Sequence, residues 1–181
     1  MSVSPTYTLY DKNNETYIFR SLNPNDAIGI WFDSLSFLNP GLTQASRIPA
    51  NFNSFTKIVE DTSPSHIWLA IVKQSDPSVH VGNVHIGAID YFNRMTFFGR
   101  FIFEPYRGLG LGTSISKSVI HYCFNELNLR KVKAGNIGDN IAARKSNEKA
   151  GLKLDYVEKN TYFHAGKYHD SFVYSAINDS F

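Results

Sequence analysis

The stretch FIFEPYRGLGLGT (residues 101–113) decides the fold, because it joins a strand to a helix through a glycine-rich turn. Residues 96–104 have the composition of a β-strand, and residues 114–127 repeat apolar side chains at i, i+4 spacing, as an amphipathic helix does. The N–H groups of a first helical turn have no partner within the helix, and the helix dipole adds positive charge there. Glycines let phosphate oxygens approach such a backbone closely. The stretch therefore predicts an anion site at a helix N-terminus.

The turn differs from two common nucleotide-binding loops. No Gly-Lys-Ser/Thr follows the glycines, which excludes a Walker loop. A dinucleotide-binding turn follows the first strand of a repeated parallel unit, whereas the strands before this turn are close enough in sequence to form an antiparallel meander. The glycines therefore need another explanation.

Strands and helices are expected on both sides of the turn. Before it, we expect a hairpin (6–10 and 15–22), helices within 23–38 and 54–61, and strands at 67–73, 79–92 and 96–104. After it, we expect a strand at 131–136, a helix at 141–150 that Asp139 or Asn140 caps and Gly151 ends, and strands at 152–164 and 167–177. This order predicts a mixed α/β sheet.

The composition is that of one globular domain, which we assign to residues 1–181. Hydrophobic residues make up 43% and aromatic residues 14%, which excludes a disordered chain. The single cysteine, Cys123, excludes an internal disulfide framework and a cysteine-based zinc site, and we expect no metal. We expect no secretory signal and no membrane span, and hence a cytoplasmic protein.

Charge is unevenly distributed along the chain. Residues 100–153 contain ten Lys/Arg and four Asp/Glu, a balance of +6, whereas the remainder is −4 and the whole is +2. The basic segment contains the glycine-rich turn, which favours an anionic ligand there. The small net charge argues against nucleic acid as a partner.

Two motifs in the basic segment resemble those of the GNAT acetyltransferase superfamily. Arg107-x-x-Gly110-x-Gly112 resembles its Arg/Gln-x-x-Gly-x-Gly/Ala signature, and the helix from Asn140 to Gly151 resembles its second motif. The resemblance implies a fold of class α/β (α+β), with a mixed, largely antiparallel, splayed sheet flanked by helices. It also implies acetyl-CoA as cofactor.

The resemblance further implies where acetyl-CoA binds. The pyrophosphate would rest on the turn, the pantetheine arm on the edge of the preceding strand, and the second motif would contact both the arm and the phosphates. The implied cofactor-binding residues are Phe101, Ile102, Phe103, Arg107, Gly108, Leu109, Gly110, Leu111, Gly112, Thr113, Asn140, Ala143, Lys145 and Ser146.

The reaction implied is direct attack of a primary amine on the thioester, which needs a base and stabilisation of the oxyanion and the thiolate. Many members carry a tyrosine acid where this chain has Asn147, and an amide cannot donate a proton in its place. The candidate catalytic residues are therefore Glu104, His85, Ser146 and Asn147.

The segment HVGNVHIG (residues 80–87) and Arg94 resemble a pattern of GNAT enzymes that act on amino sugars of nucleotide-linked sugars. Related patterns occur in enzymes that acetylate ribosomal-protein N-termini and polyamines. A nucleotide-linked amino sugar is our first expectation, with Arg47, Asn83, His85 and Arg94 as substrate-binding residues. A peptide N-terminus or another small amine is the alternative, and an acyl-CoA-binding module without turnover is a second. Residues 23–61 contain few carboxylates, which disfavours polyamines. The sequence leaves monomer and homodimer open.

Overall fold

The computed structural model describes residues 7–26, 56–57, 63–138, 140–164 and 166–179. Most of the helices expected within 23–38 and 54–61 lies outside these ranges, as does Arg47. Within them, no helix is long and apolar enough to cross a membrane.

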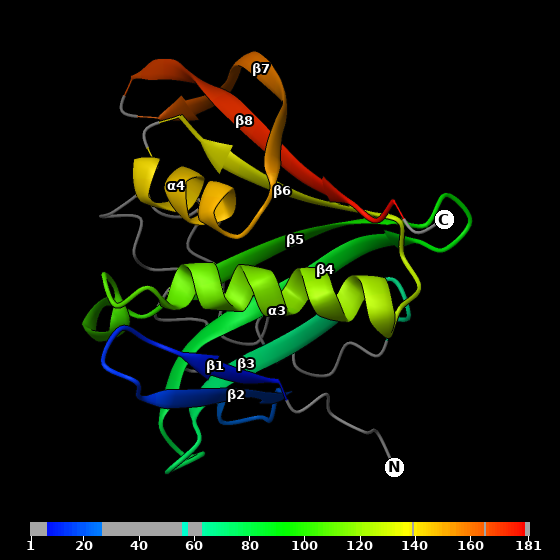
Figure 1. The fold of residues 1–181 in the computed structure, drawn as a ribbon. Helices are drawn as coiled ribbons and strands as arrows, with labels where there is room; N and C mark the ends of the chain where they lie inside the picture. Colours follow the sequence, from blue (N-terminus) through cyan, green and yellow to red (C-terminus); the bar gives the residue numbers. More distant parts are fainter. Residues whose placement is uncertain (1–6, 27–55, 58–62, 139, 165, 180–181) are drawn as a thin grey trace.

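Eight strands form one sheet in the order β1-β2-β3-β4-β5-β6-β8-β7 (Figure 1). Neighbouring strands pair antiparallel except β5 and β6, which are parallel. The predicted mixed, largely antiparallel sheet is thus confirmed. The strands are β1 (Thr8–Tyr10), β2 (Thr16–Ser21), β3 (Ile67–Lys73), β4 (His80–Asp90), β5 (Met95–Ile102), β6 (Lys131–Ile137), β7 (Lys153–His164) and β8 (Lys167–Ile177).

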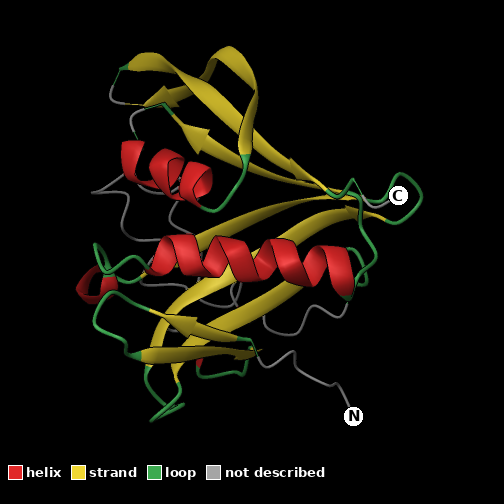
Figure 2. Ribbon diagram, viewed as in Figure 1, coloured by secondary structure: helices red, strands yellow, loops and turns green. Residues whose placement is uncertain are grey.

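Two α-helices lie on the same side of the sheet (Figure 2). α3 (Leu111–Asn125) buries Ile115, Val119 and Cys123 of the stripe that the i, i+4 pattern indicates, together with Leu111, whereas Leu127 of that stripe lies beyond its end and is half-buried. α3 starts three residues before the expected position, because Gly110 adopts the left-handed conformation (φ 85°) and serves as its N-cap. Burial raises the pKa of the Cys123 thiol to about 12, so this thiol is not a nucleophile at neutral pH.

The second helix, α4 (Ile141–Lys149), begins where the sequence indicates. The side chain of Asn140 accepts a hydrogen bond from the Ala143 N–H at 3.1 Å and caps it. A left-handed Gly151 (φ 98°) follows its last turn.

The sheet is splayed at its centre. In the described strands, β5 and β6 pair over Met95–Phe97 and Lys131–Lys133 and then separate. Figure 1 shows them meeting at one end and diverging toward the end where α3 and α4 begin. The two helix N-termini therefore lie at the open end of the gap between β5 and β6.

Candidate active site

The glycine-rich turn is held by the β1–β2 hairpin. The Gly108 carbonyl accepts a hydrogen bond from Lys12 Nζ at 3.4 Å, and the Leu109 carbonyl accepts one from the Lys12 backbone N–H at 2.8 Å. Because peptide groups are trans, the N–H groups of Leu109 and Gly110 point the other way, away from the hairpin. The Thr113 N–H donates to the Gly110 carbonyl at 3.0 Å, so it is less available than we expected. The N–H groups of Leu109 to Gly112 are therefore the candidate donors of the turn to an anion.

We expected the backbone of Phe101 to Phe103 to form the strand edge that faces the gap. The residues whose backbone faces it are instead shifted by one position. The Phe103 N–H donates to the Val81 carbonyl of β4 at 2.9 Å. Hydrogen-bonding direction alternates along a strand, so Phe101 also faces β4, while Ile102 and Arg100 present their backbone to the gap. The Ile102 carbonyl accepts from Arg107 Nε at 2.8 Å, which holds Arg107 at the start of the turn.

Ser146 joins α4 to α3 at the open end of the gap. Its Oγ lies 3.3 Å from Thr113 Oγ1, and a Cβ built on Gly112 would lie 2.9 Å from Ser146 Oγ. Glycine at 112 therefore permits the close approach of the two helices. Lys145, the next residue toward the N-terminus of α4, is exposed.

Asn147 is fully buried, with 0% of its surface exposed, rather than open to the cleft. Its Oδ1 accepts a hydrogen bond from Arg100 Nη1 at 2.9 Å, whereas its Nδ2 is buried without a partner in the described structure. Burial lowers the pKa of the Arg100 guanidinium to about 10, so it stays charged at neutral pH.

The opposite face of the sheet carries an aromatic cluster around His85. Its ring is stacked on Trp68 at 4.0 Å between centroids, and its Nε2 lies 2.9 Å from Nδ1 of His66. In the register, His85 is opposite Gly99 of β5. A Cβ built on Gly99 or on Gly135 of β6 would meet no described atom within 4 Å, so the part of the chain that the structure describes leaves this side of the gap uncovered at these two positions.

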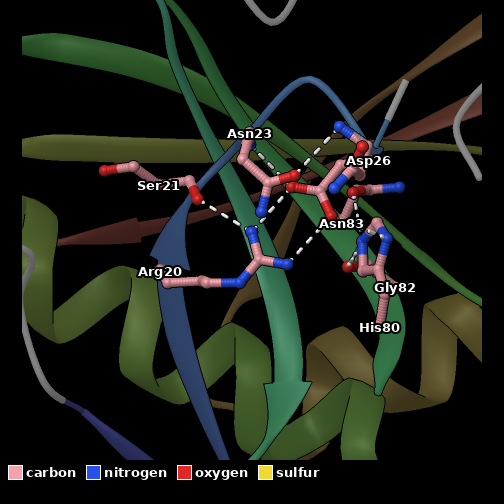
Figure 3. A network of polar contacts seen from close by, with 8 residues as sticks. Arg20, Ser21, Asn23, Asp26, His80, Gly82 and Asn83 are labelled. Carbon is pink, nitrogen blue, oxygen red and sulfur yellow. Dashed lines mark hydrogen bonds and ion pairs between the residues drawn. The ribbon is translucent and has the colours of Figure 1, made fainter. Parts of the chain in front are cut away.

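Asn83 belongs to a polar network at the end of β4 (Figure 3). Its Oδ1 lies 2.9 Å from Nε2 of His80, whose Nδ1 lies 3.3 Å from Asp26 Oδ1. Arg20 donates two hydrogen bonds to Asp26, at 2.6 and 2.9 Å. The structure thus places Asn83 in a network that ties β2 to β4.

The remaining candidates do not converge with these groups. Glu104 is exposed and opens the short 3-10 turn Glu104–Tyr106 beside the glycine-rich turn. Arg94 donates to the backbone and side-chain oxygens of Asn128, at 2.9 and 2.6 Å. Arg94 precedes β5 (8 residues). At about 3.3 Å per strand residue, this strand places it roughly 25 Å from the end of β5 that leads into the glycine-rich turn.

The site therefore has two sides. On the α3 side, backbone N–H groups at a helix N-terminus adjoin a strand edge with a buried cation, which fits an extended anionic ligand with a polar arm. On the other side, an open aromatic surface meets the same gap. This combination fits a transferase that binds an extended, phosphate-bearing donor on one face of a splayed sheet and an acceptor on the other.

Comparison with known proteins agrees with this class. The family model described as Acetyltransferase (GNAT) domain matches residues 17–153, and the chain belongs to this family. It is an acetyl-CoA-dependent N-acetyltransferase.

The relatives are themselves acetyltransferases by description. The SPbeta prophage-derived uncharacterized N-acetyltransferase YokL of Bacillus subtilis (strain 168) is 25% identical over 92% of this chain and 93% of its own length. The crystal structure of spermidine N-acetyltransferase from Vibrio cholerae in complex with CoA and spermine has a TM-score of 0.80 at 17% identity, covering 89% of this chain and 95% of that one. A structure described as a probable acetyltransferase has a TM-score of 0.77 at 21% identity, covering 97% and 99%.

Sequence reasoning missed several residues of this site: Lys12, His66, Trp68, Arg100 and Lys133. One signal was available for Arg100, since it shares the face of β5 that buries Phe98 and a charge at such a position is rare. The contact of Lys12 with residues almost 100 positions away leaves no local pattern.

Proposed function

We propose that the chain acetylates a primary amine on an anionic small molecule, with the amino group of a nucleotide-linked amino sugar as the first candidate. The supporting observation is Lys133, whose ammonium lies 5.2 Å from the centre of the Phe97 ring at the closed end of the gap. Phe97 is 39% exposed, so this cation is accessible on the aromatic side.

Acetyl-CoA is assigned to the α3 side. The N–H groups of Leu109 to Gly112 bind the pyrophosphate, with Arg107 and Lys12 adding positive charge nearby. The arm then runs along the gap edge of β5, past Ile102, as an extended chain adds to a sheet edge. Ser146 and Asn140 line this path from α4.

The amine approaches from the other face, past Gly99 and Gly135. The described side chains near this opening are Trp68, His66, His85, Phe97 and Lys133. Asp155 is a carboxylate that acts on Lys133, but it is paired with Lys131 at 2.6 Å, so the positive charges outnumber it. A polycation would be repelled by Lys133, whereas a phosphate or carboxylate would be attracted. His85, paired with His66, is the base candidate on this face.

A polyamine is the second candidate, because one structural neighbour is a spermidine N-acetyltransferase bound to spermine. The two candidates differ in charge, so one residue can separate them.

We expect Lys133→Glu to lower kcat/KM for a nucleoside-diphosphate-linked amino sugar about tenfold, because one favourable charge contact becomes repulsive. The same variant should maintain or raise kcat/KM for spermidine. Release of free CoA thiol measures both, with a peptide carrying a free N-terminal amine as a third acceptor.

The matched control is Lys167→Glu, an equal charge reversal at an exposed residue of the β7–β8 hairpin. It should leave both rates near wild type. If spermidine is the best acceptor and Lys133→Glu does not favour it further, the anionic acceptor is refuted.

A further inference from the structure

We propose that Arg100 is a catalytic residue that binds the sulfur of the coenzyme and stabilises the thiolate as it leaves, in a site where Asn147 stands at the position of the family's tyrosine acid. The inference rests on the acetyltransferase activity and does not depend on which amine is the acceptor.

The position of Arg100 on β5 supports its contact with the sulfur of the coenzyme. An arm that starts at the glycine-rich turn and follows the gap edge of β5 passes Ile102 and then Arg100 before β5 and β6 close at Phe97. The reactive end of the arm must therefore lie between Ile102 and Phe97. In this stretch of β5, Arg100 carries the one charged side chain.

The guanidinium has spare capacity to bind an anion. Its hydrogen-bond partner in the described structure is the neutral Asn147 amide, and the Phe98 ring lies 5.8 Å away. Two charged groups of α4 are engaged with each other through a tyrosine, since Arg144 donates to the Tyr174 hydroxyl, which donates to Glu148; Lys145 and Lys149 are exposed. A desolvated cation without a carboxylate is costly unless a ligand supplies the negative charge.

Asn147 positions the cation. Its carbonyl oxygen holds Nη1 of Arg100, and its Nδ2 is buried without a partner in the described structure. Because this partner is uncharged, the positive charge of Arg100 is left for a ligand to compensate. Arg100 Nε also lies close to the glycine-rich turn, 3.5 Å from a Cβ built on Gly112.

The chemistry balances without an acid. The neutral amine nitrogen bonds to the acetyl carbon, the carbon–sulfur bond breaks with its electron pair on sulfur, and the amine's proton passes to solvent or to His85. Arg100 keeps its own proton throughout, because its pKa of about 10 is above that of a free thiol near 8.5. Its contribution is electrostatic and acts where negative charge develops.

The direct test is titration of the CoA thiol bound to wild-type enzyme, followed by the ultraviolet absorbance of the thiolate and needing no acceptor. We expect the bound thiol's pKa to be at least about one unit below that of free CoA, near 8.5. Cys123 does not interfere, since it is the chain's one cysteine and burial raises its pKa to about 12. An unshifted pKa in wild type would overturn the proposal.

Variants separate this role from a structural one. Arg100→Gln should return the bound thiol's pKa to the free value and lower kcat about 100-fold, and Arg100→Lys should restore part of both. Wild type should also bind CoA more tightly than desulfo-CoA, and Arg100→Gln should lose this preference. If Arg100→Gln weakens the binding of CoA and of desulfo-CoA equally, and the bound thiol has the same pKa in wild type and in the variant, Arg100 has a structural role. That result would refute the proposal. If Arg100→Gln does not fold, the wild-type titration and Arg100→Lys decide the question.

Discussion

Gly110→Asp is expected to weaken acetyl-CoA binding at least about 100-fold while the chain still folds. Gly110 is the N-cap of α3 at φ 85°, and a Cβ there meets no atom within 4 Å. Asp is among the residues that tolerate left-handed backbone, and it suits an N-cap. Its carboxylate would occupy the place of the pyrophosphate and repel it. Calorimetry of acetyl-CoA binding measures the effect.

Two controls isolate the charge from the backbone. Gly110→Asn adds a neutral side chain of the same shape and should lose much less affinity. Gly151→Asp makes the same change at another left-handed glycine with open space, φ 98°, beyond the end of α4 and should bind normally. An affinity of Gly110→Asp equal to that of wild type would exclude the turn as the phosphate site.

Asp26→Asn is expected to lower the free energy of unfolding by about 3 kcal/mol at neutral pH. Asp26 is 4% exposed and accepts hydrogen bonds from Arg20 and from the Asn23 N–H, with His80 beside it (Figure 3). Removing one partner of a buried ion pair leaves an uncompensated charge, which costs roughly 3–5 kcal/mol. Arg20 is partly exposed, so the lower end applies. Chemical denaturation measures the change.

The same variant has a defined pH dependence. Burial alone would raise the pKa of Asp26, but Arg20, the Asn23 N–H and His80 outweigh it and hold that pKa below its usual value. A lowered folded-state pKa contributes stability that is present above the unfolded pKa, about 3.9, and is lost as pH falls through the folded value. The difference between wild type and Asp26→Asn should therefore shrink below about pH 4.

Asp76→Asn is the matched control for both measurements. Asp76 also accepts two hydrogen bonds, both from Ser78, but it lies in an exposed turn. Its replacement should leave stability near wild type. An Asp26→Asn variant as stable as Asp76→Asn would show that the network contributes little.

Much of the fold follows from local patterns. The apolar run of β3, the i, i+4 stripe of α3 and the cap at Asn140 each depend on residues close in sequence, so they were predicted nearly to the residue. Where a glycine controls the boundary, as Gly110 does for α3, the start moved by three residues. The glycine-rich turn at a helix start was also predictable, because it needs only glycines and a following helix, while its role as a phosphate site stays a prediction.

The site's side chains were less predictable, since each depends on partners far away. Arg94 had the right residue type for an anion site, but Asn128 binds it at the closed end of β5. Asn147 was expected in the cleft, yet Arg100, 47 residues earlier, holds it in the interior. Lys12 reaches the turn from the first hairpin.

The sequence by itself determined the family, the splayed sheet and the glycine-rich turn at the start of α3, because hydrophobic period, glycine placement and helix caps act over a few residues. Only the tertiary structure decided which cation lies beside the gap, which strand edge is open and which face carries the aromatic cluster. Those depend on the register of β4 against β5 and on where β5 leaves β6. A shift of β5 by one residue would send Arg100 to the other face, and a shift of β4 by one residue would send His85 into the core.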